Sequence, residues 1–275
     1  MTALDTSTAP AAAAAPGAPA LVVTGLSIRF GGLTAVEDMT FEVNEGEVLS
    51  LIGPNGAGKT SAFNAITGYI QAASGSIVYR GAPLLGLKPN QIAAHGVVRT
   101  FQKTSVFNGL PVLDNVLVGL HLRARQHPLA IILGLPGVKR DEARLREAAW
   151  DILTLVGLDG RAHETAASLP YGELRLLEVA IALAAEPTLL LLDEPVSGMN
   201  PSETGAFMAL LGRIRARGVT VLLVEHDMKM VMGVSDRVVC LNQGRIIADG
   251  PPAAIQRDPQ VIRAYLGERY VRARG

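Results

Sequence analysis

The sequence predicts an α/β protein with a parallel central sheet, covered by helices on both faces, and a separate helical lobe. Two observations lead to this prediction. Short apolar runs alternate with helical patterns along most of the chain, and the strand signal disappears between about residues 110 and 185. The runs TLLLLD and VTVLLVE are apolar at successive positions, as in parallel strands buried on both faces. We therefore expect a parallel sheet with a helical insertion.

Length and composition are those of an ordinary globular protein. The chain has 275 residues, 49% of them hydrophobic, and its 25 Lys and Arg balance 25 Asp and Glu. A chain of this length buries about three quarters of its unfolded surface, so it needs no disulfide or metal for stability. Balanced charge provides no general attraction to nucleic acid or anionic lipid. The longest nearly apolar stretch, residues 129–138, is too short for the ~20 residues of a membrane span.

Six segments predict strands, because β-branched residues or leucines cluster in them between turn residues. They are residues 21–30, 40–53, 75–81, 188–195, 219–227 and 237–250. In the lobe, Leu145, Ala148, Ile152 and Val156 recur at helical spacing. Residues 127–139, rich in Pro and Gly, predict a link between two helices of the lobe.

The N-terminal segment and the single cysteine carry little chemistry. Residues 1–20 are mostly Ala, Pro and Thr without the basic start of a secretory signal, and they predict a disordered tail. Cys240 lies in the apolar run RVVCLNQG, so we expect a buried small side chain rather than a reactive thiol. A lone cysteine forms no internal disulfide, which fits a reducing compartment.

The most specific motif is GPNGAGKT at residues 53–60, which matches the phosphate-loop pattern G-x-x-x-x-G-K-[ST] between a predicted strand and a helical pattern. Gly56 and Gly58 lack side chains, so successive backbone N–H groups can face a phosphate at the positive end of the next helix. We expect Lys59 to bridge the β- and γ-phosphates and Thr60 to bind Mg²⁺. The flanking strand and helix disfavour the alternative, a Gly-rich turn without a ligand.

Two acids end the hydrophobic strand LLLLDEP. We expect Asp193 to hold Mg²⁺ and Glu194 to act as the general base for an attacking water. Alone, this pair is weak support, since a helix-start carboxylate followed by Pro195 has the same pattern. The phosphate loop earlier in the chain favours the metal and base roles.

Two further polar residues fit a nucleotide site. His226 ends the strand pattern VTVLLVEHD, where a neutral imidazole can donate a hydrogen bond to a γ-phosphate. Gln102, in VVRTFQK, is neutral and able to reach Mg²⁺ or the attacking water. Each has a plain alternative, a structural histidine and a surface glutamine.

The segment LPYGE, residues 169–173, opens the helical run that precedes the strand of Asp193. In this order and spacing, GPNGAGKT, Gln102, LPYGE, LLLLDEP, SGMNP and His226 resemble the nucleotide-binding subunit of ATP-binding cassette (ABC) transporters. The resemblance implies a P-loop NTPase-type ABC ATPase domain with a RecA-like core, an antiparallel β subdomain and a helical subdomain. It covers residues 21–267, with the helical lobe at about 110–185, and leaves a basic tail at 268–275.

The resemblance also implies roles for individual residues, with ATP and Mg²⁺ as cofactors. Phe30 would stack on adenine, Gln102 would sense the γ-phosphate and His226 would act as a switch. The residues so implied are, for catalysis, Glu194, His226 and Gln102; for the nucleotide, Phe30, Gly53, Asn55, Gly56, Gly58, Lys59, Thr60, Ser61, Tyr171, Gly172 and Glu173; and for the metal, Thr60, Gln102 and Asp193.

The signature LPYGE departs from the LSGGQ that is usual in the family. Pro170 stands where a serine hydroxyl would reach the γ-phosphate, so attraction must come from backbone N–H groups near Gly172 and from the helix N-terminus. Proline is structurally benign in the first turn of a helix, so the motif can still form. Asn200 of SGMNP likewise replaces the more frequent Asp.

Other segments narrow the resemblance. The signature with YG, VVRTFQKTSVF, the SG-x-NP turn, VEHDMKMVM and the ending DPQVIRAYLGE resemble the ATP-binding subunits of branched-chain amino acid importers, whose close relatives handle urea and short amides. The implied function is ATP hydrolysis that powers solute uptake across the cell membrane, at its cytoplasmic face. Alone, the helical spacing of VIRAYLG fits a plain packing helix equally well.

The implied partners are transmembrane permease subunits, a second ABC ATPase subunit that is identical or homologous, and, indirectly, a periplasmic or extracellular solute-binding protein, with no nucleic acid. Two chains would sandwich two ATP molecules, each between the phosphate loop of one and the signature helix of the other. Val106, Phe107 and Leu110 are candidates for the membrane-subunit contact, although packing within the domain explains them equally well.

Two alternatives stay open at this point. A soluble ABC ATPase acting on ribosomes or nucleic acid commonly carries two fused cassettes or a coiled coil, and this sequence has one cassette and no coiled coil. A degenerate, non-hydrolysing partner is suggested only by Pro170. The intact Lys59, Asp193, Glu194 and His226 argue against it.

Overall fold

A computed structural model describes residues 19–100, 106–120 and 136–272, with side chains described from 140 to 265 in the last range. Its strands form two sheets, of order β10-β9-β3-β8-β7-β6 and β2-β1-β4-β5. The strands are β1 (Pro19–Phe30), β2 (Leu33–Asn44), β3 (Val48–Ile52), β4 (Ser74–Tyr79), β5 (Ala82–Pro83), β6 (Val97–Arg99), β7 (Leu189–Asp193), β8 (Thr220–Val224), β9 (Arg237–Asn242) and β10 (Arg245–Gly250).

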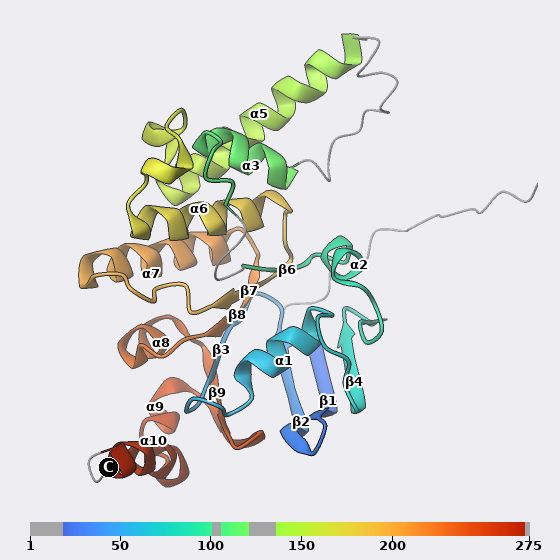
Figure 1. Cartoon of the computed structure of the whole chain (residues 1–275), viewed down its shortest axis with the longest axis vertical. Helices are drawn as coiled ribbons and strands as arrows, with labels where there is room; N and C mark the ends of the chain where they lie inside the picture. Colours follow the sequence, from blue (N-terminus) through green and yellow to red (C-terminus); the bar gives the residue numbers. More distant parts are fainter. Residues whose placement is uncertain (1–18, 101–105, 121–135, 273–275) are drawn as a thin grey trace, which may run out of the picture.

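Helices pack on these sheets and form a lobe at one end of the molecule (Figure 1). The helices are α1 (Lys59–Ile66), α2 (Pro89–Ala94), α3 (Val112–Leu120), α5 (Pro136–Val156), α6 (Tyr171–Ala184), α7 (Pro201–Ala216), α8 (Met228–Val234), α9 (Pro252–Ile255) and α10 (Pro259–Arg272), with 3₁₀ turns at Asp159–Arg161 and Ala166–Ser168. No helix among the described residues is both long enough and apolar enough to cross a membrane.

The central strands β9, β3, β8, β7 and β6 are parallel neighbours, as the sequence predicts. Their two faces enter different cores. Leu189 and Leu191 of β7 pack with α1 and the antiparallel sheet, whereas Leu190 and Leu192 pack with α6 and α7. Burial on both faces is the reason for the continuous apolar run in this strand.

The second sheet is antiparallel and packs against the other side of α1. Phe63 of α1 is fully buried in this core with Leu26 of β1 and Val43 of β2. Helix α1 therefore lies between the two sheets (Figure 1). Its placement matters for the site, because the helix starts at the end of the phosphate-loop motif.

The strand boundaries correct the sequence prediction at several points. The segment 40–53 is two strands, because the turn at Glu45–Gly46 ends β2 and sends β3 into the other sheet. The segment 237–250 is also two strands, because the turn at Gln243–Gly244 separates β9 from its antiparallel neighbour β10. Strand β6, only Val97–Arg99, has no separate signal in the sequence, since three residues are too few to show a pattern.

In the part of the chain that the structure describes, the helical lobe contains α3, α5 and α6. Ile152 and Val156 of α5 are buried with α3 and α6, which confirms the predicted helical spacing. The predicted link at 127–139 is wrong at its end, because α5 begins at Pro136. Proline is tolerated in the first turn of a helix, so the Pro and Gly there did not exclude one. Residues 127–135 lie outside the described residues.

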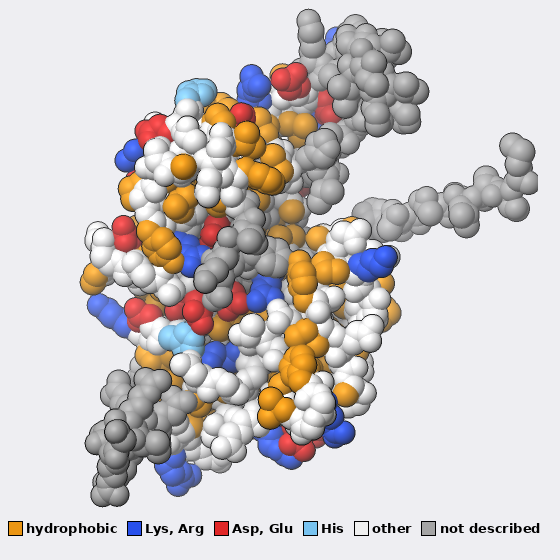
Figure 2. All heavy atoms as spheres, viewed as in Figure 1, with side chains coloured by type: hydrophobic (Ala, Val, Ile, Leu, Met, Phe, Trp, Pro, Cys, Tyr) orange, Lys and Arg blue, Asp and Glu red, His pale blue; other side chains and the backbone are white. Residues whose placement is uncertain are grey.

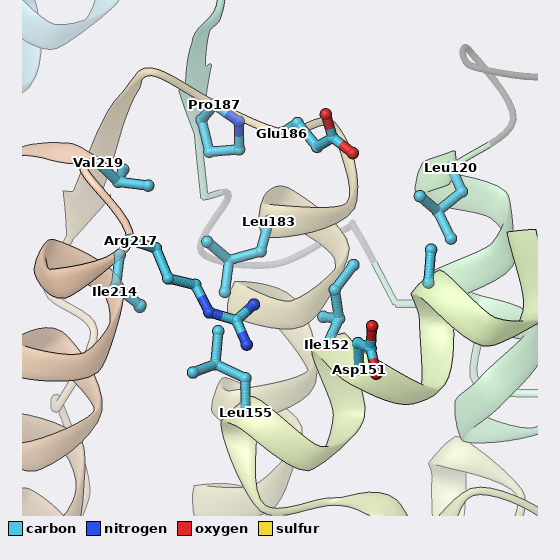
Figure 3. Close-up of a pocket in the computed structure, with 11 residues that line it drawn as sticks. Leu120, Asp151, Ile152, Leu155, Leu183, Glu186, Pro187, Ile214, Arg217 and Val219 are labelled. Carbon is cyan, nitrogen blue, oxygen red and sulfur yellow. The ribbon is translucent and has the colours of Figure 1, made fainter.

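A cavity of about 370 Å³ opens where the lobe meets the turns that lead into β7 and β8. Figure 3 shows its apolar wall, which includes Leu155, Leu183 and Ile214, and the charged side chains of Glu186 and Arg217. It lies at the amino ends of these parallel strands, away from the motifs of the nucleotide site.

The C-terminal helices α9 and α10 pack against β3 and β9. Ile52, the last residue of β3, shares a small core with Cys240, Ile255 and Val261. Helix α10 confirms the helical pattern of VIRAYLG and extends into the segment expected as a basic tail.

Cys240 provides a probe of folding. Burial, chiefly, raises the pKa of its thiol to about 11, so at pH 8 only about one thiol in a thousand is the reactive thiolate. We predict that a maleimide or disulfide reagent leaves the folded protein unlabelled and labels one site per chain after denaturation. Labelling of the folded protein at the rate of a small free thiol would contradict this burial.

Candidate functional site

Three loops that carry the predicted chemistry meet at the carboxyl edge of the parallel sheet. Strand β3 pairs with β8, and β8 pairs with β7. The loops that follow these strands contain the phosphate-loop motif, His226 and Glu194, respectively. Carboxyl ends of parallel strands share one edge, where open α/β sheets bind their ligands. Figure 2 shows acidic, basic and histidine side chains gathered across the middle of the molecule, where the lobe meets the sheets.

The phosphate-loop motif has the backbone that its glycines predict. Gly56 and Gly58 have φ of 79° and 104°, in the left-handed region, and Gly58 is the N-cap of α1. A Cβ on Gly58 would lie 2.5 Å from the carbonyl oxygen of Ala35, and one on Gly53 would lie 2.2 Å from that of Leu241. Glycine is therefore required at both positions by close backbone packing as well as by φ.

Lys59 lies inside its own loop. Its Nζ donates to the carbonyl oxygens of Gly53 and Pro54 at 2.6 and 3.0 Å, and the residue is only 6% exposed. An ammonium group is thus held at the concave side of the loop, beside the N-terminus of α1. Both features attract an anion such as a phosphate.

A cavity of about 360 Å³ lies over this loop. Phe30 at the end of β1 and Leu33 at the start of β2 form one side and are both exposed, at 48% and 67%. Of the residues predicted from the sequence, the cavity is lined by Phe30, Asn55, Gly56, Gly58, Lys59, Thr60, Ser61, Glu194 and His226. The sequence analysis missed Leu33, Thr34 and Ala35, although the Gly31–Gly32 turn after Phe30 marks a hairpin that brings them close.

Glu194 and His226 form a direct pair at the cavity. Nε2 of His226 lies 2.9 Å from Oε1 of Glu194. Glu194 has a left-handed φ of 49°, which costs a residue with a Cβ about 1 kcal/mol or more. Its backbone N–H donates to the carbonyl oxygen of Val224 at 2.8 Å, so the strained turn is tied to the end of β8.

Glu225 ties the two loops together, and the sequence analysis did not single it out. Its side chain is buried and accepts hydrogen bonds from the backbone N–H groups of Val196 and His226, both at 2.9 Å. Burial, above all, raises the pKa of this carboxyl, and the charge of Glu194 adds to the effect. The pattern VEHD at the end of a buried strand is the signal that marks it, since a charge there needs local partners.

Asp193 is buried beneath the cavity rather than lining it. Its Oδ2 accepts from Arg99 of β6 at 2.6 Å, in an ion pair whose side chains are 4% and 9% exposed. Asp193 pairs with Val224 in the sheet register, next to the strand that carries Glu225 and His226. The predicted metal acid is therefore present at the sheet edge with a cation at one of its oxygens.

The signature segment does not line the cavity formed by the same chain. Pro170 is the N-cap of α6, and Tyr171 in the first turn is 50% exposed. Arg175 donates two hydrogen bonds to the Tyr171 hydroxyl, at 2.6 and 3.0 Å. Glu173 pairs with Arg161 at 2.8 Å. Tyr171 thus stands exposed at a helix N-terminus that another molecule can reach, whereas Gly172 beside it is buried against Glu203.

Asn200 functions as a helix cap. Its Oδ1 accepts from the N–H groups of Ser202 and Glu203 at 2.9 and 3.0 Å, and Glu203 accepts from the N–H of Asn200 at 2.8 Å. This is a complete capping box, in which Asn is as good as Asp. The carboxylate of Glu203 also contacts Gly172, where an added Cβ would lie 2.8 Å from Oε1.

The segment that follows the predicted Gln102 is held in a fixed shape. Gln102 itself lies outside the described residues. Buried Asn115 of α3 accepts from the N–H of Phe107 at 2.7 Å and donates to its carbonyl at 3.1 Å and to that of Pro111 at 3.0 Å. Phe107 is 53% exposed and Leu110 36%. An apolar surface is thus presented on a rigid loop.

Comparisons with known proteins agree with this geometry. The family model described as "ABC transporter" matches residues 36–197, and that described as "Branched-chain amino acid ATP-binding cassette transporter" matches residues 245–271. The high-affinity branched-chain amino acid transport ATP-binding protein LivG of Salmonella typhimurium is 46% identical over 91% of this chain and 98% of its own. BraF of Pseudomonas aeruginosa, of the same description, is 45% identical over 91% and 98%.

Solved structures extend the comparison to the fold. An ATP-binding cassette of an ABC transporter in its ADP conformation superposes with a TM-score of 0.80 at 28% identity, over 91% of this chain and 99% of that one. A nucleotide-free cassette superposes with a TM-score of 0.79 at 28% identity, over 90% and 99%. The predicted fold class is confirmed.

The role of Glu225 is testable with an isosteric change. In Glu225→Gln, one of the two oxygens becomes an NH₂ group, which cannot accept from the backbone N–H of Val196 or His226. We predict a loss of nucleotide turnover of about tenfold or more, with nucleotide affinity within about twofold of the unaltered protein, because the phosphate loop does not contact Glu225.

Asp258→Asn is the matched control, because its carboxylate also accepts from backbone N–H groups, those of Gln260 and Val261, but at the start of α10. It should keep turnover within about twofold. Equal losses in the two variants would contradict a specific role for Glu225.

Proposed function

This chain belongs to the ABC transporter family and is an ABC importer ATPase, and from this premise we propose that it powers the uptake of branched-chain amino acids. The observation that carries the proposal is a single cavity that brings together the phosphate loop with Lys59 and the Glu194–His226 pair, in a chain whose C-terminal segment matches the branched-chain amino acid model. The identity of 45–46% to LivG and BraF over 91% of the chain supports the solute class.

The geometry supports a role for each group. The β- and γ-phosphates of ATP would take the place of the two carbonyl partners at Nζ of Lys59, beside the N-terminus of α1. Glu194 would accept a proton from the attacking water, and His226, at 2.9 Å from it, would orient this carboxylate and the γ-phosphate. Phe30, exposed at the rim, offers its ring to the adenine base.

The donor set fits Mg²⁺. Thr60 supplies a hydroxyl in the first turn of α1, and Asp193 supplies a carboxylate at the end of β7. Hard oxygen ligands, few in number and completed by substrate phosphates and waters, are typical of magnesium sites. Bound there, the ion would neutralise developing negative charge on the phosphates. Gln102 is the third proposed ligand.

A second ATPase chain, identical or homologous, would complete each site. The cavity is lined by the phosphate loop, Glu194 and His226 but not by the signature segment, whereas Tyr171, Gly172 and Glu173 stand at the N-terminus of a separate helix. ATP between the phosphate loop of one chain and α6 of the other would join the chains. Hydrolysis would remove the γ-phosphate and let them separate.

Membrane permease subunits would dock at the apolar surface of Phe107 and Leu110. The surface is rigid because buried Asn115 binds its backbone. It follows directly on the segment of Gln102, so nucleotide state and permease contact would be linked through a few residues. The chain would then be peripheral at the cytoplasmic face of the membrane, and the solute-binding protein would act on it only through the permease.

Two variants test ATP hydrolysis and ATP binding separately. Glu194→Gln removes the base but keeps an uncharged side chain of equal size, so we predict that ATP affinity is kept while turnover falls about 100-fold or more. Lys59→Ala removes the phosphate cation, and nucleotide affinity itself should fall about tenfold or more. Isothermal titration and phosphate release measure the two quantities. Full turnover of Glu194→Gln would contradict the base role.

The permease surface is testable with the assembled transporter. Phe107→Ser should reduce co-purification with the permease subunits and abolish leucine-stimulated turnover in proteoliposomes, because a core interface aromatic often contributes about 2 kcal/mol or more. Ile262→Ser, an exposed apolar residue of α10, is the control. Turnover indifferent to every membrane partner would instead favour a soluble ABC ATPase.

A further inference from the structure

Arg99 forms a contact with the predicted metal acid that none of the motifs requires. We propose that Arg99 is a positioning residue that holds the Asp193 carboxylate and excludes free Mg²⁺ from it, so that the metal enters the site only together with the nucleotide. The proposal rests on the metal role of Asp193 given above.

The contacts of Arg99 connect three elements. From strand β6, its guanidinium donates to Oδ2 of Asp193 at 2.6 Å and to Oδ1 of Asn64 at 2.5 Å, and it stands 5.5 Å from the centre of the Phe63 ring. Asn64 and Phe63 belong to α1, the helix that begins with Lys59 and Thr60. Arg99 therefore ties the end of β7 to the helix that carries the other proposed metal ligand.

The planar guanidinium fixes the orientation of the acid. Its two terminal nitrogens donate to different partners, so a rotation of Asp193 would break its hydrogen bond to Nη2 while Asn64 holds Nη1. Oδ2 is committed to Arg99, which leaves Oδ1 for a metal ion or its bound water. A ligand oxygen that is held in one orientation, as Oδ1 is here, favours an ordered metal site.

The same pair explains how metal and nucleotide binding are linked. Both side chains are buried, 9% and 4% exposed, so solvent screens their attraction weakly. A divalent ion alone meets a carboxylate already neutralised by an arginine. With ATP in the phosphate loop, the phosphates add negative charge to the site, and this added charge attracts the ion. Arg99 thus disfavours the metal-bound, nucleotide-free state.

Direct metal binding tests the proposal without reference to turnover. Mn²⁺ serves as the paramagnetic probe, and its free concentration is measured by electron paramagnetic resonance on nucleotide-free protein. In Arg99→Met an unbranched apolar side chain replaces the arginine beside Phe63 and the charge is lost, so we predict that Mn²⁺ alone binds about tenfold or more tightly than to the unaltered protein. The double variant Arg99→Met/Asp193→Asn should lose this gain.

Two more variants separate charge from geometry. Arg99→Lys keeps the charge without the fork, so it should bind Mn²⁺ as weakly as the unaltered protein yet lower kcat about tenfold. Arg99→Gln removes the charge but keeps hydrogen-bonding capacity, and it replaces Arg99→Met if that variant does not fold. ATP affinity in EDTA, expected within about twofold in every variant, reports an intact phosphate loop.

The outcomes distinguish this inference from the function on which it rests. Equal Mn²⁺ affinity with and without Arg99, combined with a loss of Mg²⁺-dependent nucleotide affinity in Asp193→Asn, would overturn the role of Arg99 and leave the metal role of Asp193 in place. Unchanged Mg²⁺ dependence in Asp193→Asn would overturn both.

Discussion

The site depends on the adjacency of three parallel strands. Because β3, β8 and β7 are neighbours in that order, the loops after them must emerge side by side at one sheet edge. The phosphate loop, His226 and the two acids are widely separated in sequence, and this pairing brings them together. The apolar cores on both faces of the strands hold the register, since a shift by one residue would exchange the two faces.

Buried polar side chains then hold the loops that follow these strands through hydrogen bonds. Glu225 binds the backbone after Glu194 and that of His226, and Arg99 binds Asp193 and α1. The left-handed φ of Glu194 is tolerated because its N–H is held by β8. Hydrogen bonds within the chain thus hold Asp193 and the loops of Glu194 and His226, whereas the signature helix belongs to the lobe and does not line the cavity of its own chain.

Much of this arrangement was predictable from the sequence, because ordered motifs at strand ends identify the phosphate loop, Asp193, Glu194 and His226. The departures are explained by local structure, Pro170 as the N-cap of α6 and Asn200 as a complete capping box. Two of the residues that were missed, Arg99 and Glu225, contact other residues of the chain rather than line the cavity. Arg99 on a three-residue edge strand and Glu225 before the histidine have meaning only through partners distant in sequence, and Leu33 enters the site through a hairpin.

The central claim is that each site needs the phosphate loop of one ATPase chain and the signature helix of another. A structure of the Glu194→Gln variant with Mg²⁺ and ATP, assembled with its permease and second ATPase chain, tests this claim most directly. The account predicts the γ-phosphate between Lys59 and the N-terminus of α6 from the facing ATPase chain. ATP bound by Lys59 with Tyr171 still open to solvent in every chain would contradict it.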